Sequence, residues 1–231
     1  MSRRSRRQSR LEAPLSFVPP PWPGGPCLEL VYEFNERFIQ ETAEVAREGD
    51  ASTLPDMVRI HRDLWVALDP PACHRASRCP FLLADIQFRN EAWWQRVQSD
   101  ASWQSGPAIS VRHFPRRRAV ELMRDALIVA WYTARQDTRL AAGLLAMSDG
   151  VTRAVAKLSL RHLRLIPDHH HQHLRLRWEY LSSFWGRLLS AASRDDAEAL
   201  HDLHLHAYQL ADADSGFAVS AADSDPGIPE K

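Results

Sequence analysis

The stretch LSLRHLRLIPDHHHQHLRLRWEYLSSFW, residues 158–185, contains a helix start, a histidine run, an alternating segment and a tryptophan-bearing helix. Ser159 is placed to accept the free N–H groups of the first helical turn. Beyond the histidines, Leu174, Leu176 and Trp178 alternate with polar residues, which is typical of a half-buried strand. The stretch therefore predicts a helix–turn–strand–helix unit.

A fainter relative of this stretch, LDPPACHRASRCPFLLADIQFRNEAWW, occupies residues 68–94. Asp69 takes its capping position, ahead of two prolines that have no N–H to leave unpaired. An offset of 90 residues lays Ala84, Ile86 and Phe88 on the alternating residues of the later stretch, and the alignment ends one residue out of step. We interpret the pair as a weak internal duplication. The two strands are expected to pair antiparallel, because this would satisfy their open edges.

Composition places few restrictions on the function. The 231 residues, of which 45% are apolar, suffice for one large domain or two small ones with a real core. The formal net charge of zero provides no global field toward nucleic acid or an anionic membrane. Three cysteines, an odd number, favour a reducing compartment. Without an apolar run near the ~20 residues of a membrane span, or a secretory signal, we expect a cytoplasmic protein.

Apolar periodicity predicts a mainly α fold in two helical halves, each with one short strand. We expect a disordered basic and Pro-rich arm over 1–27, a first repeat over 28–97, a linker over 98–118, a second repeat over 119–210 and a disordered acidic tail over 211–231. The predicted strands cover 82–88 and 172–178, with a further edge strand over 108–114. The predicted helices are 28–47, 55–68, 70–78 and 90–97, then 119–136, 138–158 with an interruption near 148–150, 159–166, 182–192 and 195–210.

Several short motifs of the second half stand in a recognisable order: Ala134-Arg135-Gln136-Asp137, the segment 142–147, AVAKLSL at 154–160, Leu176-Arg177-Trp178-Glu179, and a last helix that carries His204. This order resembles that of the FlhD family, the flagellar transcriptional regulators of proteobacteria. The first half, from VYEFN at 31–35, is similar to that family's first helix. Leu174 and Ala84 depart from the enteric members, which have a cysteine near this position beside their dimer axis.

The resemblance implies a fold and a function. Family members are about half this length, form homodimers and work with the partner FlhC, which carries much of the DNA contact. By this resemblance the chain is a fused pseudo-dimer and a non-enzymatic transcriptional regulator that acts through an FlhC-like protein at promoter DNA. The competing interpretation is an adaptor protein that kept the fold and lost the promoter function.

Two sets of arginines are candidates for contact with phosphate or a partner. The first set is expected on one outward face of the predicted helix and strand: Arg161, Arg164, Arg175 and Arg177. The second set lies in the N-terminal arm: Arg3, Arg4, Arg6 and Arg7. A solvated basic face and a solvated arm are the alternatives that need no ligand.

Other polar and aromatic clusters have ordinary explanations beside the functional ones. Trp93 and Phe184 are candidate anchors for a partner, with core packing as the alternative. The run of His169, His170, His171 and His173 suggests a metal site, but consecutive residues of a turn point apart, which favours surface histidines. Cys73 and Cys79 lack the second pair of a zinc motif. No catalytic template fits, so we expect neither an enzyme nor a bound cofactor.

Overall fold

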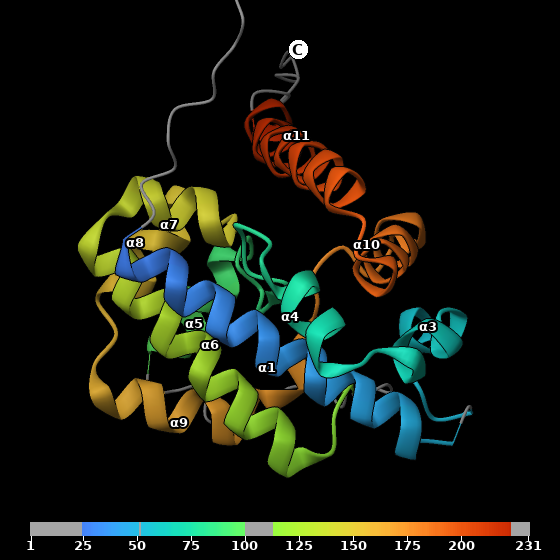
Figure 1. Cartoon of the computed structure of the whole chain (residues 1–231). Coiled ribbons are helices and arrows are strands. Elements are labelled where there is room, and N and C mark those ends of the chain that lie inside the picture. The colour runs from blue at the N-terminus through green and yellow to red at the C-terminus, as the bar shows by residue number, and fades with distance from the viewer. Residues whose placement is uncertain (1–24, 51, 100–112, 223–231) are drawn as a thin grey trace, which may run out of the picture.

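The computed structural model describes residues 25–50, 52–99 and 113–222, with side chains up to Leu210. Over these residues the protein is mainly helical, with one two-stranded sheet (Figure 1). The first half contains α1 (Pro26–Glu48), α2 (Asp56–Ile60), α3 (Arg62–Ala67), α4 (Pro70–Ser77), β1 (Ala84–Asp85) and α5 (Glu91–Gln98). The second half contains α6 (Arg116–Gln136), α7 (Thr138–Leu145), α8 (Asp149–Ala156), α9 (Leu160–His170), η2 (His171–His173), β2 (Arg175–Leu176), α10 (Ser182–Arg194) and α11 (Ala197–Ala222).

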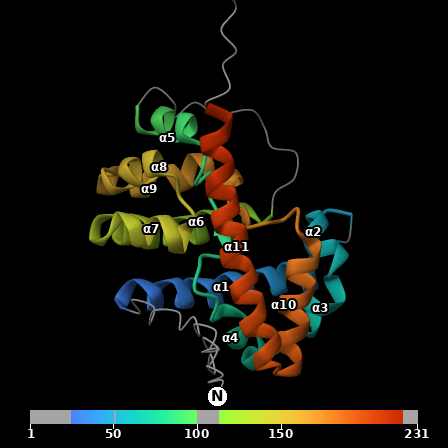
Figure 2. The same cartoon turned by 90° about the horizontal axis from the view of Figure 1, so that it is seen from above.

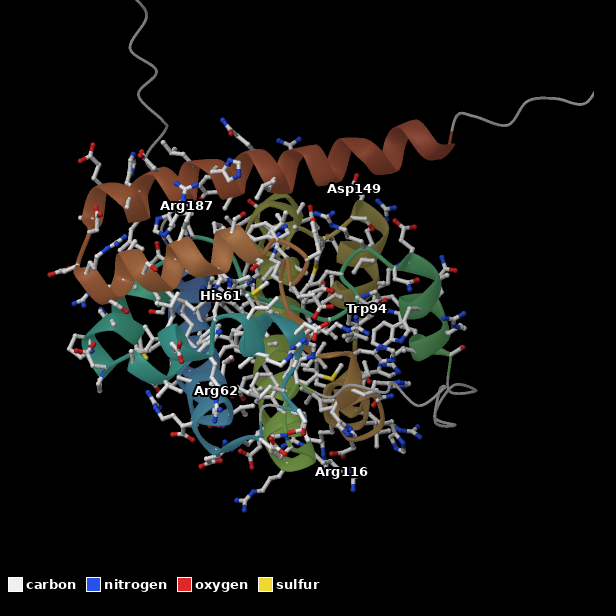
Figure 3. All side chains as sticks on the ribbon, turned by 90° about the vertical axis from the view of Figure 1, so that its right-hand side faces the viewer. His61, Arg62, Trp94, Arg116, Asp149 and Arg187 are labelled. Atoms are coloured by element: carbon white, nitrogen blue, oxygen red, sulfur yellow. The ribbon has the colours of Figure 1, made fainter. Side chains whose placement is uncertain are left out.

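The two longest helices of the core, α1 and α6, lie side by side at the centre of the molecule (Figure 1). Helix α4 packs on α1, and α9 packs on α6. Helices α10 and α11 pack together along one edge (Figures 1 and 3), and Figure 2 shows how far α11 extends past α10. In the part of the chain that the structure describes, no helix combines the length and the apolar character needed to cross a membrane.

The predicted antiparallel pairing of the two strands is confirmed, although each strand has only two residues. Ala84 pairs with Leu176, and Asp85 pairs with Arg175. The N–H of Arg177 continues the pairing with a bond of 2.8 Å to the carbonyl of Leu83. Both strands then end in left-handed backbone, at Gln87 (φ 54°) and Trp178 (φ 52°). A residue in that region cannot continue a strand, which explains why the alternating pattern overpredicted the strand lengths.

The capping residues of the two stretches act as the sequence predicts. Asp69 accepts a 2.8 Å bond from the N–H of Ala72, and Ser159 accepts a 3.3 Å bond from that of His162. Asn90 likewise caps α5. These bonds satisfy N–H groups that the first turn of a helix leaves free.

Each stretch also ends in a buried tryptophan whose indole bonds to the backbone near the strand. Trp94 Nε1–H donates to the carbonyl of Gln87 over 2.9 Å, and Trp185 Nε1–H donates to that of Arg177 over 2.8 Å. Both side chains are fully buried. The two tryptophans therefore fix the end of a strand against the helix that follows it.

Asn35, fully buried on α1, holds the chain that leads into β1. Its amide nitrogen donates to the carbonyl of Phe81 over 2.9 Å and approaches those of Ser77 and Cys79 at 3.3 Å. Its amide oxygen accepts the N–H of Leu83 over 2.9 Å. One side chain thus replaces the regular backbone bonds that this irregular segment lacks.

Two predicted helices are divided. His61 leaves helical geometry (φ −109°, ψ 25°) and separates α2 from α3 within the predicted helix 55–68. The predicted interruption of helix 138–158 is confirmed: Ala146 is left-handed (φ 48°), and Ser148 caps α8.

Two other helix ends differ from prediction. Helix α9 continues through Pro167 to His170, where the sequence predicts a loop. The buried side chains of Ile166 and His170 keep this last helical turn against the core. The last helix begins after Asp196, whose carboxylate accepts the N–H of Ala199 over 3.0 Å, and not at Asp195. It runs to Ala222, so residues 211–222 have helical backbone where the sequence predicts a disordered tail.

Candidate functional site

A cleft of ≈ 1360 Å³ opens between the end of α1, the turn before α2, the segment before α6 and the loop after β2. Its floor is apolar and consists of Val45, Leu54, Met57 and Phe114, each at most 9% exposed. The ring of Phe114 lies 5.5 Å from that of Phe38 on α1, which anchors the segment before α6 to the core. Both halves of the chain therefore contribute to this cleft.

Gly49, Asp50 and residues 52–55 give one side of the cleft its shape. A Cβ atom on Gly49 would lie 2.6 Å from the side chain of Leu54 and 2.7 Å from the carbonyl of Val45, so only glycine fits there. Asp50 then accepts bonds from the N–H and hydroxyl of Ser52, an Asx turn. Pro55, which has no N–H, leads into α2.

A polar wall of three side chains stands at the opposite side of the cleft. Glu179 lies 2.9 Å from Nε2 of His113 and accepts a 3.0 Å bond from Arg175. Burial raises the pKa of Glu179, but the bond from His113 and the charges of His113 and Arg175 outweigh it, so the net pKa is lowered. The carboxylate therefore stays ionised and holds both basic groups in place.

The rim of the cleft is exposed. Tyr180 is 69% exposed, and Arg59 and Arg116 also reach solvent. Arg59 pairs with Asp56 on its own helix. Arg116 lies at the edge of the molecule opposite α11 (Figure 3), and no ion pair of Arg116 is found among the residues that the structure describes. The cleft thus combines an apolar floor with a polar rim.

The four arginines expected on one outward face are separated, so that prediction is wrong. Arg177 is only 5% exposed and donates to the carbonyls of Leu82 and Leu144 over 3.1 and 3.4 Å. It points inward because these carbonyls need a donor and its guanidinium stacks over the Trp178 ring, 4.6 Å away. Arg175 belongs to the polar wall.

The remaining arginine candidates have different positions. Arg161 and Arg164 are exposed on α9, as predicted for a contact or solvated face. Arg3, Arg4, Arg6 and Arg7 lie outside the described residues.

Both candidate anchor aromatics are core residues. Trp93 is 6% exposed and Phe184 is 3% exposed. Phe184 packs between the rings of Trp178 and Trp185 at 5.1 and 5.7 Å. In this structure neither ring is available to a partner, and the core-packing alternative is correct.

Two histidines of the run, His170 and His173, pack on the same core. The rings of His170 and His173 lie edge-on to Trp93, with centroids 5.5 and 5.2 Å away. Burial, and then the nearby His173, lowers the pKa of His170 to about 4. Within the described ranges no three His, Cys, Asp or Glu side chains are grouped as a metal site requires. His170 and His173 therefore serve as core packing at the end of α9.

The closest cysteine–histidine contact does not form an activated thiolate. Cys79 Sγ lies 3.3 Å from Nε2 of His204 on α11, and the thiol is fully buried. Burial raises the pKa of Cys79 and lowers that of His204 to about 4. A nucleophilic thiolate needs the opposite shifts. This contact instead holds α11 against the turn before β1.

His61 joins the two halves at another place. Its Nε2 lies 2.8 Å from both the hydroxyl and the carbonyl oxygen of Ser182, at the start of α10. A Cβ on Gly186 would approach the imidazole to 2.7 Å, so the ring lies directly on the helix, as Figure 3 shows. Arg62 points the other way and donates to the carbonyls of Ala46 and Gly49.

Sequence reasoning did not find the cleft. The available signal was the offset of 90, which lays residues 48–55 on the helix-forming segment 138–145 although the earlier segment contains Gly49, Asp50 and Pro55. Residues that break a helix in one of two aligned segments alone indicate a local difference in shape. Comparisons of the chain with protein-family models, with curated proteins and with solved structures give no match.

Proposed function

We propose that the protein is a non-enzymatic transcriptional regulator that resembles FlhD and is built as an intramolecular pseudo-dimer. In this proposal residues 28–97 and 119–210 are two diverged repeats, and the protein acts through an FlhC-like partner at promoter DNA. The proposal rests on the relation between the two halves, and the regulatory role comes from the resemblance of the second half to the FlhD family.

The observation that carries the pseudo-dimer is the register of the strand pair. The offset of 90 makes Asp85 equivalent to Arg175, and these two residues pair with each other. It also makes Ile86 equivalent to Leu176 and Ala84 equivalent to Leu174. An antiparallel pair that is centred on equivalent residues is what a two-fold axis between two copies would produce.

Packing between the halves supports the same arrangement. Helix α5 of the first half packs on α8 of the second, and α10 of the second packs on α3 of the first. The contacts at these two places are Ser148 with Glu91, 2.7 Å, and His61 with Ser182. In each half, the helix that follows the strand, α5 or α10, therefore packs on a helix of the other half, as in intertwined dimers of separate chains.

The mass of the purified protein in solution tests the pseudo-dimer. Size-exclusion chromatography with light scattering is expected to give one chain per particle, because the pairing surface is used within the chain. An obligate homodimer would contradict the proposal.

Promoter cross-linking in cells tests the regulatory role. We expect occupancy at specific promoters that depends on an FlhC-like protein and co-purification of that protein with the chain. Deletion of residues 1–10 separates a DNA-contacting arm from a solvated one: a fall in occupancy supports contact by the arm. Absence of both promoter occupancy and an FlhC-like partner would contradict the regulatory role.

One observation favours the adaptor as a second candidate. Of the four arginines proposed for contact on the helix and strand, Arg175 and Arg177 are engaged within the protein. An adaptor needs a partner surface but no phosphate contacts. Stable binding of a protein partner without any promoter occupancy would favour this function over the regulator.

A further inference from the structure

The cleft occupies the place that α7 has in the other half. Under the offset of 90, residues 48–55 correspond to 138–145, which form α7. Helix α7 buries Ala141, Leu144 and Leu145, and the carbonyl of Leu144 accepts the N–H of Leu82 ahead of β1. The first half has a turn and an open cleft here instead.

The two halves nevertheless keep the same buried anchors. Leu54 and Leu144 are equivalent and are 6% and 1% exposed, and the equivalent Met57 and Met147 are 3% and 4% exposed. The helical turns ahead of these anchors are missing only in the first half, since Gly49 and Asp50 end α1 and Pro55 prevents a helix from passing through. Leu54 and Met57 therefore lie in the floor of the cleft, and the helical backbone that α7 forms around Leu144 has no counterpart there.

We infer that this cleft binds a short amphipathic helix of a partner protein, about two turns long, in the place that α7 fills in the second half. The inference rests on the repeat proposed above. A two-turn helix is roughly 11 Å long. The cleft volume of ≈ 1360 Å³ exceeds the roughly 300–1,000 Å³ of small-molecule pockets. An apolar stripe that lies in a groove is an established mode of helix recognition.

The rim defines the chemistry of the partner helix. Tyr180 is 69% exposed beside the apolar floor, which suits an aromatic anchor that packs along a bound helix. Among the described residues, Arg59 pairs with Asp56, Arg175 with Glu179, and the acidic rim residue Glu48 with Arg118. Arg116 is exposed and is the rim cation for which no ion pair is found within that part of the chain. The matching helix therefore has leucine-like residues toward the floor and an acidic residue toward Arg116.

A peptide with the sequence of α7 and its flanks, DTRLAAGLLAM (137–147), is the probe. Fluorescence anisotropy of the labelled peptide with the full chain is expected to show saturable binding. Substitution of both leucines that correspond to Leu144 and Leu145 by serine in the peptide should abolish it. Tyr180→Ala in the protein should weaken binding about tenfold, the effect of losing one anchor of ~1.4 kcal/mol.

Two matched substitutions locate the site. Thr53→Trp places a large ring in the turn beside the cleft and should block the peptide. Gly143→Trp is the control, because position 143 is equivalent to 53, and nothing lies within 4 Å of a Cβ there. Unchanged thermal unfolding of both variants shows that they fold. Equal binding by the two variants would overturn the inference.

A charge reversal tests the role of Arg116. A peptide with glutamate in place of Arg139 should bind the native protein more tightly than the native peptide, and Arg116→Glu should invert this preference. A preference that stays the same in the Arg116→Glu protein would contradict an acidic residue at this position.

The assay contains neither DNA nor a second protein, so its outcome is separate from that of the proposed function. Peptide binding by a protein that is an obligate homodimer would leave the cleft in place and overturn the repeat. Lack of saturable binding by a monomeric, promoter-bound protein would overturn the partner-helix cleft alone. Tyr180→Ala or Thr53→Trp variants with a changed particle mass would identify a second copy as the occupant and also overturn it.

Discussion

The stretches 68–94 and 158–185 form the same helix–strand–helix unit, but their turns are covered in different ways. In the first unit, Cys79 and Phe81 contact α11 through His204. In the second, α9 is longer and ends in η2, and its histidines pack on Trp93 of the other unit. The shared parts are the caps, the strand pair and the tryptophans. The two stretches therefore share the caps, the strand pair and the tryptophans, and differ in the residues that cover their turns.

The largest difference is expected at Asn35 of α1, whose side chain holds the segment before β1 of the first unit, whereas the equivalent Asp125 of α6 bonds to Arg37. Asn35→Ala removes the partner of three carbonyls and one N–H in a buried segment, which should cost roughly 3 kcal/mol in the free energy of unfolding. Urea unfolding followed by circular dichroism measures it.

Asp125, equivalent to Asn35 under the offset of 90, is the matched control. It forms a partly exposed ion pair with Arg37, so Asp125→Ala should cost less than about 1 kcal/mol. Equal losses at the two positions would mean that the segment before β1 does not depend on the amide network.

The tryptophan that ends each stretch should contribute equally to the free energy of unfolding. Trp94 and Trp185 are both fully buried, and each donates one indole bond to the backbone beside its strand. Trp→Phe at either position removes that bond and leaves a small void, at a cost of about 2 kcal/mol each. Denaturant unfolding of the two single variants compares them. A loss at one tryptophan alone would argue against equivalent roles.

Much of this comparison could be predicted from the sequence because it depends on local signals. The caps at Asp69 and Ser159 follow from residue type and position, and the pairing of the strands follows from the internal offset. The short strands could not be predicted, since the chain takes left-handed backbone at Gln87 and Trp178 without a glycine that would indicate it in the sequence.

The candidate site was less accessible to sequence reasoning. The alternation that places Arg177 outward assumes a strand that continues past Leu176, and the chain leaves the strand there. Trp93 and Phe184 have the residue types of partner anchors, but only packing shows that they are buried. The cleft depends on the absence of a helix, and a pattern of residues indicates elements more readily than the space between them.

Replacement of a glycine by alanine should lower the stability of the protein at Gly186 of α10 and raise it at Gly143 of α7. At Gly186 the new Cβ would press on the His61 ring and disturb its contacts with Ser182, so Gly186→Ala should destabilise the protein by about 1 kcal/mol. At Gly143 the Cβ meets open space, so Gly143→Ala should stabilise α7 by about 0.5 kcal/mol. Thermal unfolding measures both. A gain in stability at Gly186 would show that His61 is free to move aside.

The smallest expected effect is the loss of stability in acid that arises from two histidines, His170 at the end of α9 and His204 on α11. Burial lowers the pKa of His170 and that of His204 to about 4, against roughly 6.5 in an unfolded chain. Below pH 6.5 the unfolded chain therefore binds protons that the folded protein resists. The contribution of each neutral histidine is fully present above pH 6.5 and is lost as the pH falls toward 4.

Melting temperatures between pH 7.5 and 5 should therefore decrease, and this range stays above the titration of most carboxylates. His170→Gln and His204→Gln should each reduce the slope, and the double variant should reduce it most, because glutamine takes up no proton in this range. Additive reductions would mean that protonation of His170 and of His204 destabilises the protein independently. A slope unchanged in the double variant would show that the acid sensitivity arises elsewhere in the molecule.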